Sequence, residues 1–521
     1  MTAGRSLRES GKKETTLRIV AGIGLSLMSL VMLITAFPPT NIWPFAFFCV
    51  VPMLVAQYRV LPVKWTWVAP AISGTLWVLW LVVMLFGISM ETSFVLLIPI
   101  IVFIKDYFSA KGNRQFHEST KYRYFVLEGI FGWVGFEMIR SFIPLVRMHG
   151  FIGHMVHTQP WLIQPVSIFG IYGLNLIIIL VNYALAQGAF ALIDRRWQWH
   201  DVPEFSKRLV SRWLVSAGAA LVVWVTISLI ILGGAPKDPE TVRVAAVQSG
   251  IPVPAHWPPD QPQEERLQNL MEQTRVAAQQ GAQLVVWPEL GVGFDPQVEH
   301  TDELRGLAAD TDATLVIGYG LATETESRNA AVPLLPSGEF LPIHGKSHVP
   351  PGEPLDPDAG KYPVYETSIG LWGTIICHDA NFSESGRIMA RKGAQLLAVP
   401  TFEAYIPGFE KIFYIQMVFR SVENRIATVK SDTAFSSAIV DPYGRVLELR
   451  SGAPDGESFA LVADVPLGSG DTLYTHLGDW VGWLSLVGFA FFMVLPEVIK
   501  RRQKKEPAGA AKAEEHEDAA S

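Results

Sequence analysis

Eight apolar runs, each near the length that crosses a lipid bilayer, constrain this chain more than any other feature. A helix needs about 20 predominantly apolar residues to span the hydrocarbon core of a membrane. The runs occupy residues 17–36, 44–61, 66–86, 91–106, 124–144, 164–188, 213–233 and 478–498. The sequence therefore predicts a polytopic α-helical membrane protein with about eight spans.

Composition agrees with this class and excludes others. Hydrophobic residues make up 50% of the chain and charged residues only 17%, whereas soluble domains carry about 25% charged residues. The net charge of -7 provides no basic surface of the kind that binds nucleic acid. Two cysteines leave no room for a disulfide framework.

Lysine and arginine predict the orientation, because cytoplasmic loops carry an excess of both. Basic residues gather before or at the start of the first run, in or next to alternate loops, and after the last run; they are Arg5, Arg8, Lys12, Lys13, Arg18, Arg59, Lys64, Lys105, Lys111, Arg114, Lys121, Arg123, Arg195, Arg196, Lys207, Arg208, Arg212, Lys500, Arg501, Arg502, Lys504 and Lys505. The other connections are nearly free of them. Both termini are expected in the cytoplasm and residues 234–475 outside it.

Four regions follow from these patterns. We expect a membrane domain of seven helices over 1–233, an outward α/β domain over 234–475, a closing span over 476–499, and a disordered cytoplasmic tail over 500–521. The tail is rich in Ala, Glu and Lys, which is typical of solvated chain ends.

Strand and helix patterns alternate between residues 234 and 475, which favours an α/β sandwich. The pattern predicts strands over Thr241–Ser249, Gln283–Trp287, Ala313–Gly318 and Gln395–Val399, and a hairpin over Ser436–Leu449. It predicts helices over Gln263–Gly281, Thr301–Asp310, Ser383–Lys392 and Gly408–Arg425.

Cys377 ends the apolar run Ile369–Ile376, at the tip of an expected strand. A lone cysteine is most simply a buried structural residue. In an exported domain without a disulfide partner, however, a thiol at a strand end can also be kept for its chemistry. Nucleophilic use needs a base or a positive charge nearby, and Glu289 and Lys346 are the candidates.

The order of short motifs around these residues resembles the nitrilase superfamily. Trp287-Pro-Glu289 comes first, and His344-Gly-Lys346 follows. Val349-Pro-Pro-Gly-Glu353 and Ile376-Cys377 complete the set. Together with seven preceding spans and one closing span, the chain is similar to the apolipoprotein N-acyltransferase family.

That resemblance implies an α-β-β-α sandwich and a role for each matching residue. Glu289 would be the acid and base, Lys346 would support the oxyanion, and Cys377 would be acylated. Glu353 would lie near them, and Trp257 would correspond to a tryptophan that takes part in substrate binding.

The loops around the site depart from the family pattern. His378-Asp379 stands where the family has Tyr-Glu after the nucleophile. Thr401–Tyr405 replaces Asn-Asp-Ala-Trp-Phe, and Asp432–Ala434 replaces Asn-x-Gly. His378 and Asp379 either place the acceptor or only pack the loop. Unlike Tyr, a histidine titrates near neutral pH, so His378 can also add a proton-handling step.

The resemblance implies transfer of a fatty acyl chain from membrane phospholipid, through a cysteine thioester, to the α-amine of a diacylglyceryl-cysteine lipoprotein. The expected place is a bacterial cytoplasmic membrane, with the α/β domain on its outer face. No metal or organic cofactor is expected, and the spacing of His149, His154 and His157 matches no metal-binding pattern.

Two other functions are also compatible with the sequence. A membrane-tethered amidase or nitrilase would use the same three residues and pass the acyl group to water. A non-enzymatic membrane receptor or transporter would carry a degenerate domain of the same fold.

Overall fold

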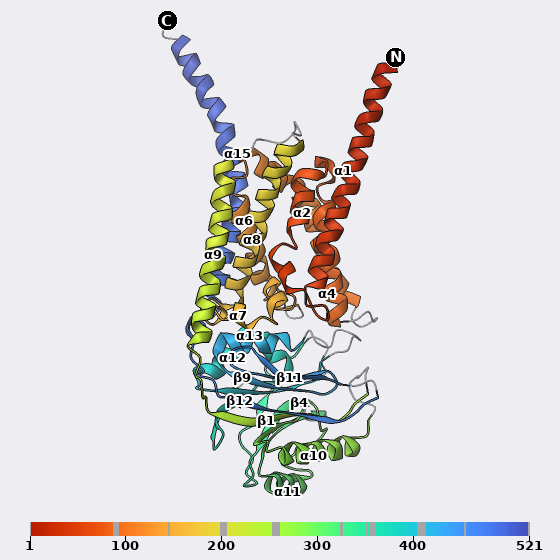
Figure 1. The fold of residues 1–521 in the computed structure, drawn as a ribbon, viewed down its shortest axis with the longest axis vertical. Helices are drawn as coiled ribbons and strands as arrows, with labels where there is room; N and C mark the ends of the chain where they lie inside the picture. The colour runs from red at the N-terminus through yellow and green to blue at the C-terminus, as the bar shows by residue number, and fades with distance from the viewer. Residues whose placement is uncertain are drawn as a thin grey trace.

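The computed structural model describes residues 2–86, 93–143, 146–197, 206–252, 261–322, 327–350, 353, 361–403, 413–452 and 455–518. It has two parts, which Figure 1 shows one above the other. Helices form a bundle at the end that carries both termini. The sandwich domain lies at the opposite end.

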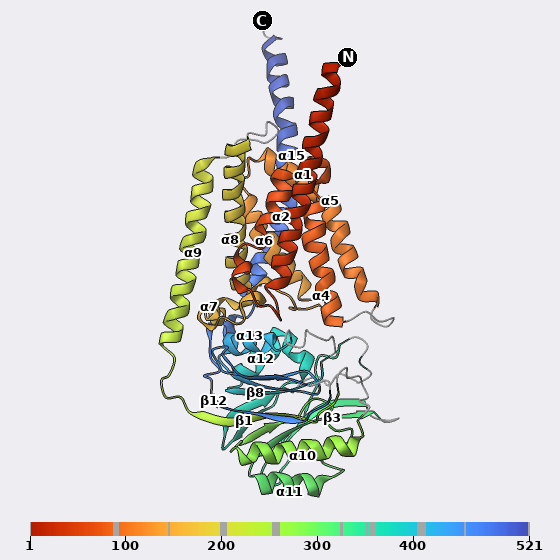
Figure 2. The ribbon, with the colours of Figure 1, turned by 45° about the vertical axis from the view of Figure 1, so that its right-hand side comes forward.

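The bundle is built from helices that run up and down in sequence order (Figures 1 and 2). The α-helices are α1 (Thr2–Thr35), α2 (Val51–Val55), α3 (Val68–Pro70), α4 (Leu76–Phe86), α5 (Leu97–Ser119), α6 (Phe125–Arg140), α7 (Pro160–Ile163), α8 (Val166–Trp197), α9 (Lys207–Gly233) and α15 (Trp480–Asp518). Short 3₁₀ or π turns join or extend them: η1 (Trp43–Phe47), η2 (Ala56–Val60), η3 (Val63–Trp65), η4 (Ala71–Thr75), η5 (Ser93–Leu96) and η6 (Ile152–Val156).

Six helical segments of the described chain are long and apolar enough to cross a membrane: Lys13–Thr35, Trp43–Val60, Val63–Leu85, Val166–Arg196, Lys207–Gly233 and Trp480–Arg501. They correspond to six of the eight predicted runs. The runs 91–106 and 124–144 fold as α5 and α6, which are not among the six.

Physical reasons separate these two helices from the others. The helix α5 carries the ion pair Lys105–Asp106 at 2.8 Å and further basic residues. The helix α6 has 16 residues, and about 1.5 Å of rise per residue leaves it short of the hydrocarbon thickness. Figure 2 nevertheless shows both helices as part of the bundle, with α5 at its edge.

The last helix does not end at the predicted boundary near residue 499. Its backbone continues as α15 to Asp518, through most of the segment expected to be disordered. Ala, Glu and Lys are strong helix formers, which favours continuation of a helix that has already started.

The sandwich domain contains two six-stranded sheets within the described residues. One sheet has the order β12-β1-β2-β3-β4-β5 and the other β11-β10-β9-β8-β7-β6. The strands of the first are β1 (Thr241–Gln248), β2 (Leu284–Val286), β3 (Thr314–Ala322), β4 (Ser327–Leu334), β5 (His344–Gly345) and β12 (Phe459–Pro466). Those of the second are β6 (Val364–Thr367), β7 (Gly370–Thr374), β8 (Leu396–Thr401), β9 (Ala427–Asp432), β10 (Ser436–Val440) and β11 (Val446–Ser451).

Helices cover both outer faces, which gives the expected α-β-β-α order of layers (Figure 1). The helices α10 (Gln263–Gln279) and α11 (Thr301–Thr311) cover the first sheet. The helices α12 (Ser383–Arg391) and α13 (Ile415–Asn424) cover the second, with η7 (Cys377–Asn381) before them and α14 (Leu473–Leu477) after them. The α12–α13 layer faces the membrane helices.

Apolar side chains from both sheets form the core between them, including Val244, Val286 and Trp372. The three central strands of each sheet, β1-β2-β3 and β7-β8-β9, are parallel. Carboxyl ends of parallel strands lie at one edge of a sheet, where sites in α/β folds gather.

Polar contacts attach the sandwich domain to the bundle. The ring of His157 and the hydroxyl of Tyr414 are 3.0 Å apart. Arg425 donates to Gln164 at 2.8 Å. The guanidinium of Arg147, from the connection after α6, lies 3.4 Å above the ring centre of Phe382. Since Phe382 follows η7, the segment that carries Cys377 rests against the membrane domain.

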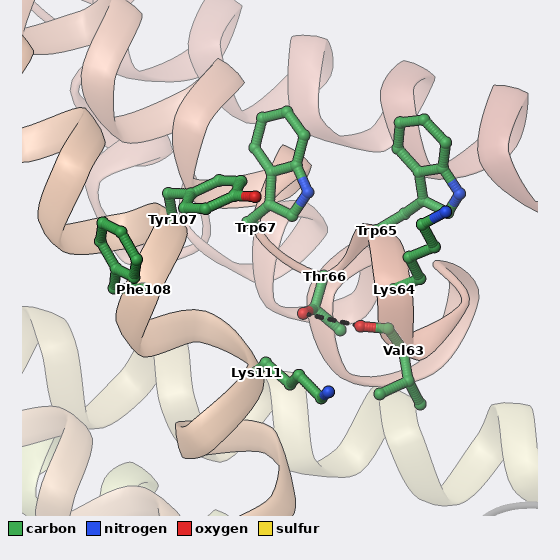
Figure 3. A pocket seen from close by; sticks show the side chains of 8 residues that line it. All are labelled: Val63, Lys64, Trp65, Thr66, Trp67, Tyr107, Phe108 and Lys111. Atoms are coloured by element: carbon green, nitrogen blue, oxygen red, sulfur yellow. Dashed lines mark hydrogen bonds between the residues drawn. The ribbon is translucent and has the colours of Figure 1, made fainter.

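A pocket of about 410 Å³ lies between η3 and α5, and Figure 3 shows its lining. Trp65, Trp67, Lys64 and Lys111 are among its residues. Tryptophan and lysine are common at membrane–water interfaces. This pocket contains none of the predicted site residues.

Candidate active site

Three predicted residues meet where strands of the two sheets end. Glu289 comes three residues after β2. Lys346 directly follows β5. Cys377 opens the turn η7 after β7. Because the two sheets face each other, residues far apart in sequence come together at this edge.

Lys346 joins two carboxylates. Its Nζ donates to Glu289 Oε1 at 2.7 Å and to Glu353 Oε2 at 2.6 Å. The side chains of Lys346 and Glu289 are each 2% exposed and that of Glu353 is 16% exposed. Glu353 therefore lies beside the other two, as the sequence predicted.

Asn329, on β4, completes this network and had not been predicted. Its Nδ2 donates to Glu289 Oε1 at 2.6 Å and to Glu353 Oε1 at 2.9 Å. The backbone N–H of Phe402 donates to Glu289 Oε2 at 2.7 Å. Glu289 is thus held from both sheets, and its orientation is fixed before any substrate arrives.

Burial and nearby charges set the protonation states of Glu289 and Lys346. Burial raises the pKa of Glu289, while the positive charge of Lys346 lowers it; the net shift is upward. Burial opposes the charge of Lys346, but Glu289 and the other nearby groups hold its pKa above the ordinary value. Lys346 therefore stays protonated, and Glu289 is a carboxylate that accepts a proton more readily than usual.

The thiol of Cys377 rests in its protonated form. Burial, and then the charge of Glu289, raise its pKa well above the ordinary value, against the charge of Lys346. The thiol points toward the carbonyl oxygen of Phe402, with Sγ and O 3.7 Å apart. Attack by sulfur consequently requires transfer of the thiol proton.

The backbone at Cys377 has φ of 44°, a left-handed conformation that is unusual for a residue with a side chain. Such a conformation costs of order 1–3 kcal/mol and is found where surrounding structure enforces it. It turns the chain sharply from β7 into η7, so the thiol stands at the apex of the turn.

His378 is buried beside Cys377, with 9% of its surface exposed. Its Nδ1 lies 3.0 Å from Asn381 Nδ2. Burial, followed by the charges of nearby groups, lowers its pKa to about 3. The expectation that His378 titrates near neutral pH is therefore wrong, because its pocket disfavours the imidazolium form.

Asp379 points away from solvent and ties the loops together. Its carboxylate accepts the backbone N–H of Ile376 at 3.1 Å, and both the backbone N–H and the ring of His348 at 2.8 Å. Burial opposes its ionisation, but hydrogen bonds from His344 and His348 hold its pKa below the ordinary range. These contacts support the loop-packing alternative for Asp379.

Trp257 lies outside the described residues. Among those that the structure does describe, no group of three or more His, Cys, Asp or Glu is arranged to hold a metal ion. His154 and His157 lie in the connection to the sandwich domain, where His157 contacts Tyr414.

Comparisons with known proteins find matches to two families and to a solved amidase. The carbon-nitrogen hydrolase family matches residues 243–473, and the apolipoprotein N-acyltransferase N-terminal domain matches residues 29–184. A solved amidase from Nesterenkonia sp. is 25% identical, with 48% of this chain and 99% of the amidase covered and a TM-score of 0.39.

Two curated relatives are similar to this chain, one over most of its length and the other over about a third of it. The apolipoprotein N-acyltransferase of Geobacter metallireducens is 26% identical, covering 90% of this chain and 94% of that protein. A nitrilase of Pyrococcus abyssi is 30% identical, covering 34% of this chain and 74% of that protein. The two matched domains and these relatives show that the chain belongs to the apolipoprotein N-acyltransferase family within the nitrilase superfamily.

Proposed function

We propose that this protein moves a fatty acyl chain from membrane phospholipid to the N-terminal amine of lipoproteins, with Glu289, Lys346 and Cys377 as its catalytic residues. The observation that carries this proposal is the placement of these residues. They meet beside a nucleophile segment that rests on the membrane domain through Arg147 and Phe382. The ester of a phospholipid at the bilayer surface is therefore an acyl donor close to this site.

Acylation begins with transfer of the thiol proton from Cys377 to Glu289, whose raised pKa suits it to accept. The thiolate attacks the ester carbonyl, and negative charge develops on the carbonyl oxygen. Lys346 and the backbone N–H of His378 are the donors that we assign to this oxyanion. The proton on Glu289 passes to the departing oxygen, and lysophospholipid leaves a thioester on Cys377.

In the second half-reaction, the acyl chain moves from Cys377 to the lipoprotein. The amine of a diacylglyceryl-cysteine lipoprotein attacks the thioester, and Glu289 accepts a proton from its nitrogen. The carbon–sulfur bond breaks, and the thiolate takes the proton back from Glu289. The acyl chain leaves as an amide.

We infer the orientation from the basic residues, which gather near both termini and in alternate loops of the sequence. Figure 1 shows both termini at the end of the bundle opposite the sandwich domain. A reporter that is active only outside the cytoplasm should be active when fused after residue 300. The same reporter should be silent after residue 510. The reverse pattern would place the site in the cytoplasm and remove the argument for phospholipid as the donor.

The function itself is tested on lipoprotein N-termini. Depletion of this protein in its host should leave lipoproteins with a free α-amine, which mass spectrometry detects as the loss of one acyl chain. Re-expression should restore that mass, and re-expression of Cys377→Ala should not. Unchanged N-termini after depletion would favour the amidase alternative, in which water discharges the same thioester.

A further inference from the structure

A second buried ionic cluster lies beside the thiol, on strand ends of the membrane-facing sheet. Lys430, on β9, donates to Glu403 at 3.0 Å, to Asp432 at 2.9 Å and to the carbonyl oxygen of Ser436 at 2.6 Å. Lys430 and Asp432 are 0% exposed, whereas the side chain of Glu403 is 11% exposed. Among these three, only Glu403 has a partly exposed side chain.

Backbone geometry places Glu403 next to the reacting groups. Phe402, its immediate neighbour, accepts from the Cys377 thiol through its carbonyl and donates to Glu289 through its N–H. The charge of Glu403 also acts on the Cys377 thiol. A carboxylate therefore lies close enough to act on the thiol, and the mechanism above leaves it unused.

The amine that accepts the acyl chain must lose a proton before it can attack the thioester. An α-amine has a pKa of about 7.7–8.0, so it arrives largely as an ammonium ion, which has no lone pair for attack. Glu289 serves the proton that leaves nitrogen after attack. The proton that must leave before attack requires another acceptor.

We propose that Glu403 binds the ammonium group of the incoming lipoprotein and accepts its first proton. This assignment rests on the proposed N-acyltransfer and adds an acceptor-binding residue to it. The carboxylate attracts the cation, and its position beside Cys377 delivers the neutral amine to the thioester. Water as an acceptor would need no residue of this kind.

The protons and electron pairs balance. The ammonium ion gives one proton to Glu403, and the nitrogen lone pair then forms the bond to the thioester carbon. When the carbon–sulfur bond breaks, its electron pair stays on sulfur. Glu289 takes the second proton from nitrogen and returns it to the Cys377 thiolate, while Glu403 releases its proton to water.

The charged groups around Glu403 suit this exchange. Lys430 and Asp432 face it from β9, and Cys377 faces it from η7. Burial raises the pKa of Glu403 to about 8, with Lys430 opposing and Asp432 adding to the shift. That value matches the pKa of an α-amine, so a proton moves between the two groups with little change in free energy. An ammonium ion bound beside Glu403 adds a positive charge that favours its carboxylate form, so binding of the acceptor prepares Glu403 to take the proton.

The test follows single-turnover discharge of the acyl-enzyme in the full-length protein. Phospholipid loads the enzyme, and a diacylglyceryl lipopeptide or hydroxylamine then discharges it at pH 6–9. One pH unit below the pKa of the lipopeptide amine, Glu403→Gln should discharge to lipopeptide about tenfold more slowly than wild type. At pH 9, where the amine is neutral, the two rates should agree within about twofold.

Three comparisons make the result specific. Hydroxylamine, already neutral at pH 7, should discharge the Glu403→Gln thioester at the wild-type rate. Glu448→Gln, which removes an exposed carboxylate on β11, should behave as wild type throughout. Glu403→Asp keeps the charge and should retain the wild-type shape of the pH profile, even where Glu403→Gln folds poorly.

The opposite outcomes overturn the assignment. If Glu403→Gln slows both nucleophiles equally at every pH, the residue only supports the fold of the site. If Glu403→Gln transfers like wild type at every pH, Glu403 has no part in transfer, while the proposed function stands. If the wild-type thioester discharges only to water, the proposed N-acyltransfer fails first and this role fails with it.

Discussion

Cys377→Ala is expected to abolish both the acyl-enzyme and all N-acyltransfer, because it removes the sulfur that we propose carries the acyl chain. Cys49, the second cysteine, is buried within the bundle. Mass spectrometry of the intact protein after incubation with phospholipid should show one added acyl chain for wild type and none for the variant.

Cys377→Ser tests whether activity depends on the nucleophilicity of the sulfur or only on the shape of the side chain. A hydroxyl needs a stronger base than a carboxylate such as Glu289, so we expect this variant to be nearly inactive as well. Both substitutions remove or replace few atoms, and the unfolding midpoint should change little. An acyl adduct on Cys377→Ala, or turnover near the wild-type level, would show that the thioester forms elsewhere.

Much of the sandwich could be predicted from local pattern. The expected strands Thr241–Ser249 and Gln395–Val399 appear as β1 and β8 with small shifts at their ends. The amphipathic pattern over Gln263–Gly281 folds as α10. Periodicity alone predicts these segments, because it depends only on residues that are close together in the chain.

Strands whose structure depends on pairing with a neighbour were missed. The strand β12 pairs with β1 across more than two hundred residues, and β4 with β3 after a short connection. Their sequences are less regular, and pairing decides their structure. Asn329 was also missed, because its role depends on hydrogen bonds to two carboxylates from other parts of the chain.

The loops beyond the three matched residues were the least predictable part of the site. A histidine after a nucleophile suggests titration near neutral pH, but the burial that lowers the pKa of His378 to about 3 appears only in three dimensions. The ion pair between Lys430 and Glu403 likewise joins two segments that share no sequence motif.

Lys346→Ala should lower the rate of acylation by about 10² or more, the usual loss when an oxyanion donor is removed. It should also destabilise the fold, because two carboxylates, Glu289 and Glu353, lose the cation between them. Breaking a buried pair by removing one partner costs about 3–5 kcal/mol. Activity alone therefore does not separate catalysis from folding.

Addition of Glu353→Gln separates the two effects. The double variant Lys346→Ala/Glu353→Gln has one buried carboxylate in place of two, so most of the lost stability should return, as read by its unfolding midpoint. Acylation should stay at the low rate of the single variant, because the oxyanion donor is still absent. Recovery of acylation together with stability would assign Lys346 a structural role only.

The pH dependence of stability gives an independent check on Lys346→Ala. Without the ammonium group, Glu289 and Glu353 repel each other and one of them keeps its proton to a higher pH than in the unfolded chain. A folded-state pKa above the unfolded value adds stability at low pH, and that stability is lost as the pH rises through the folded pKa. The unfolding midpoint of Lys346→Ala should thus fall below wild type more at pH 8 than at pH 5. The double variant should show a smaller dependence, since its remaining carboxylate has no charged neighbour across Asn329.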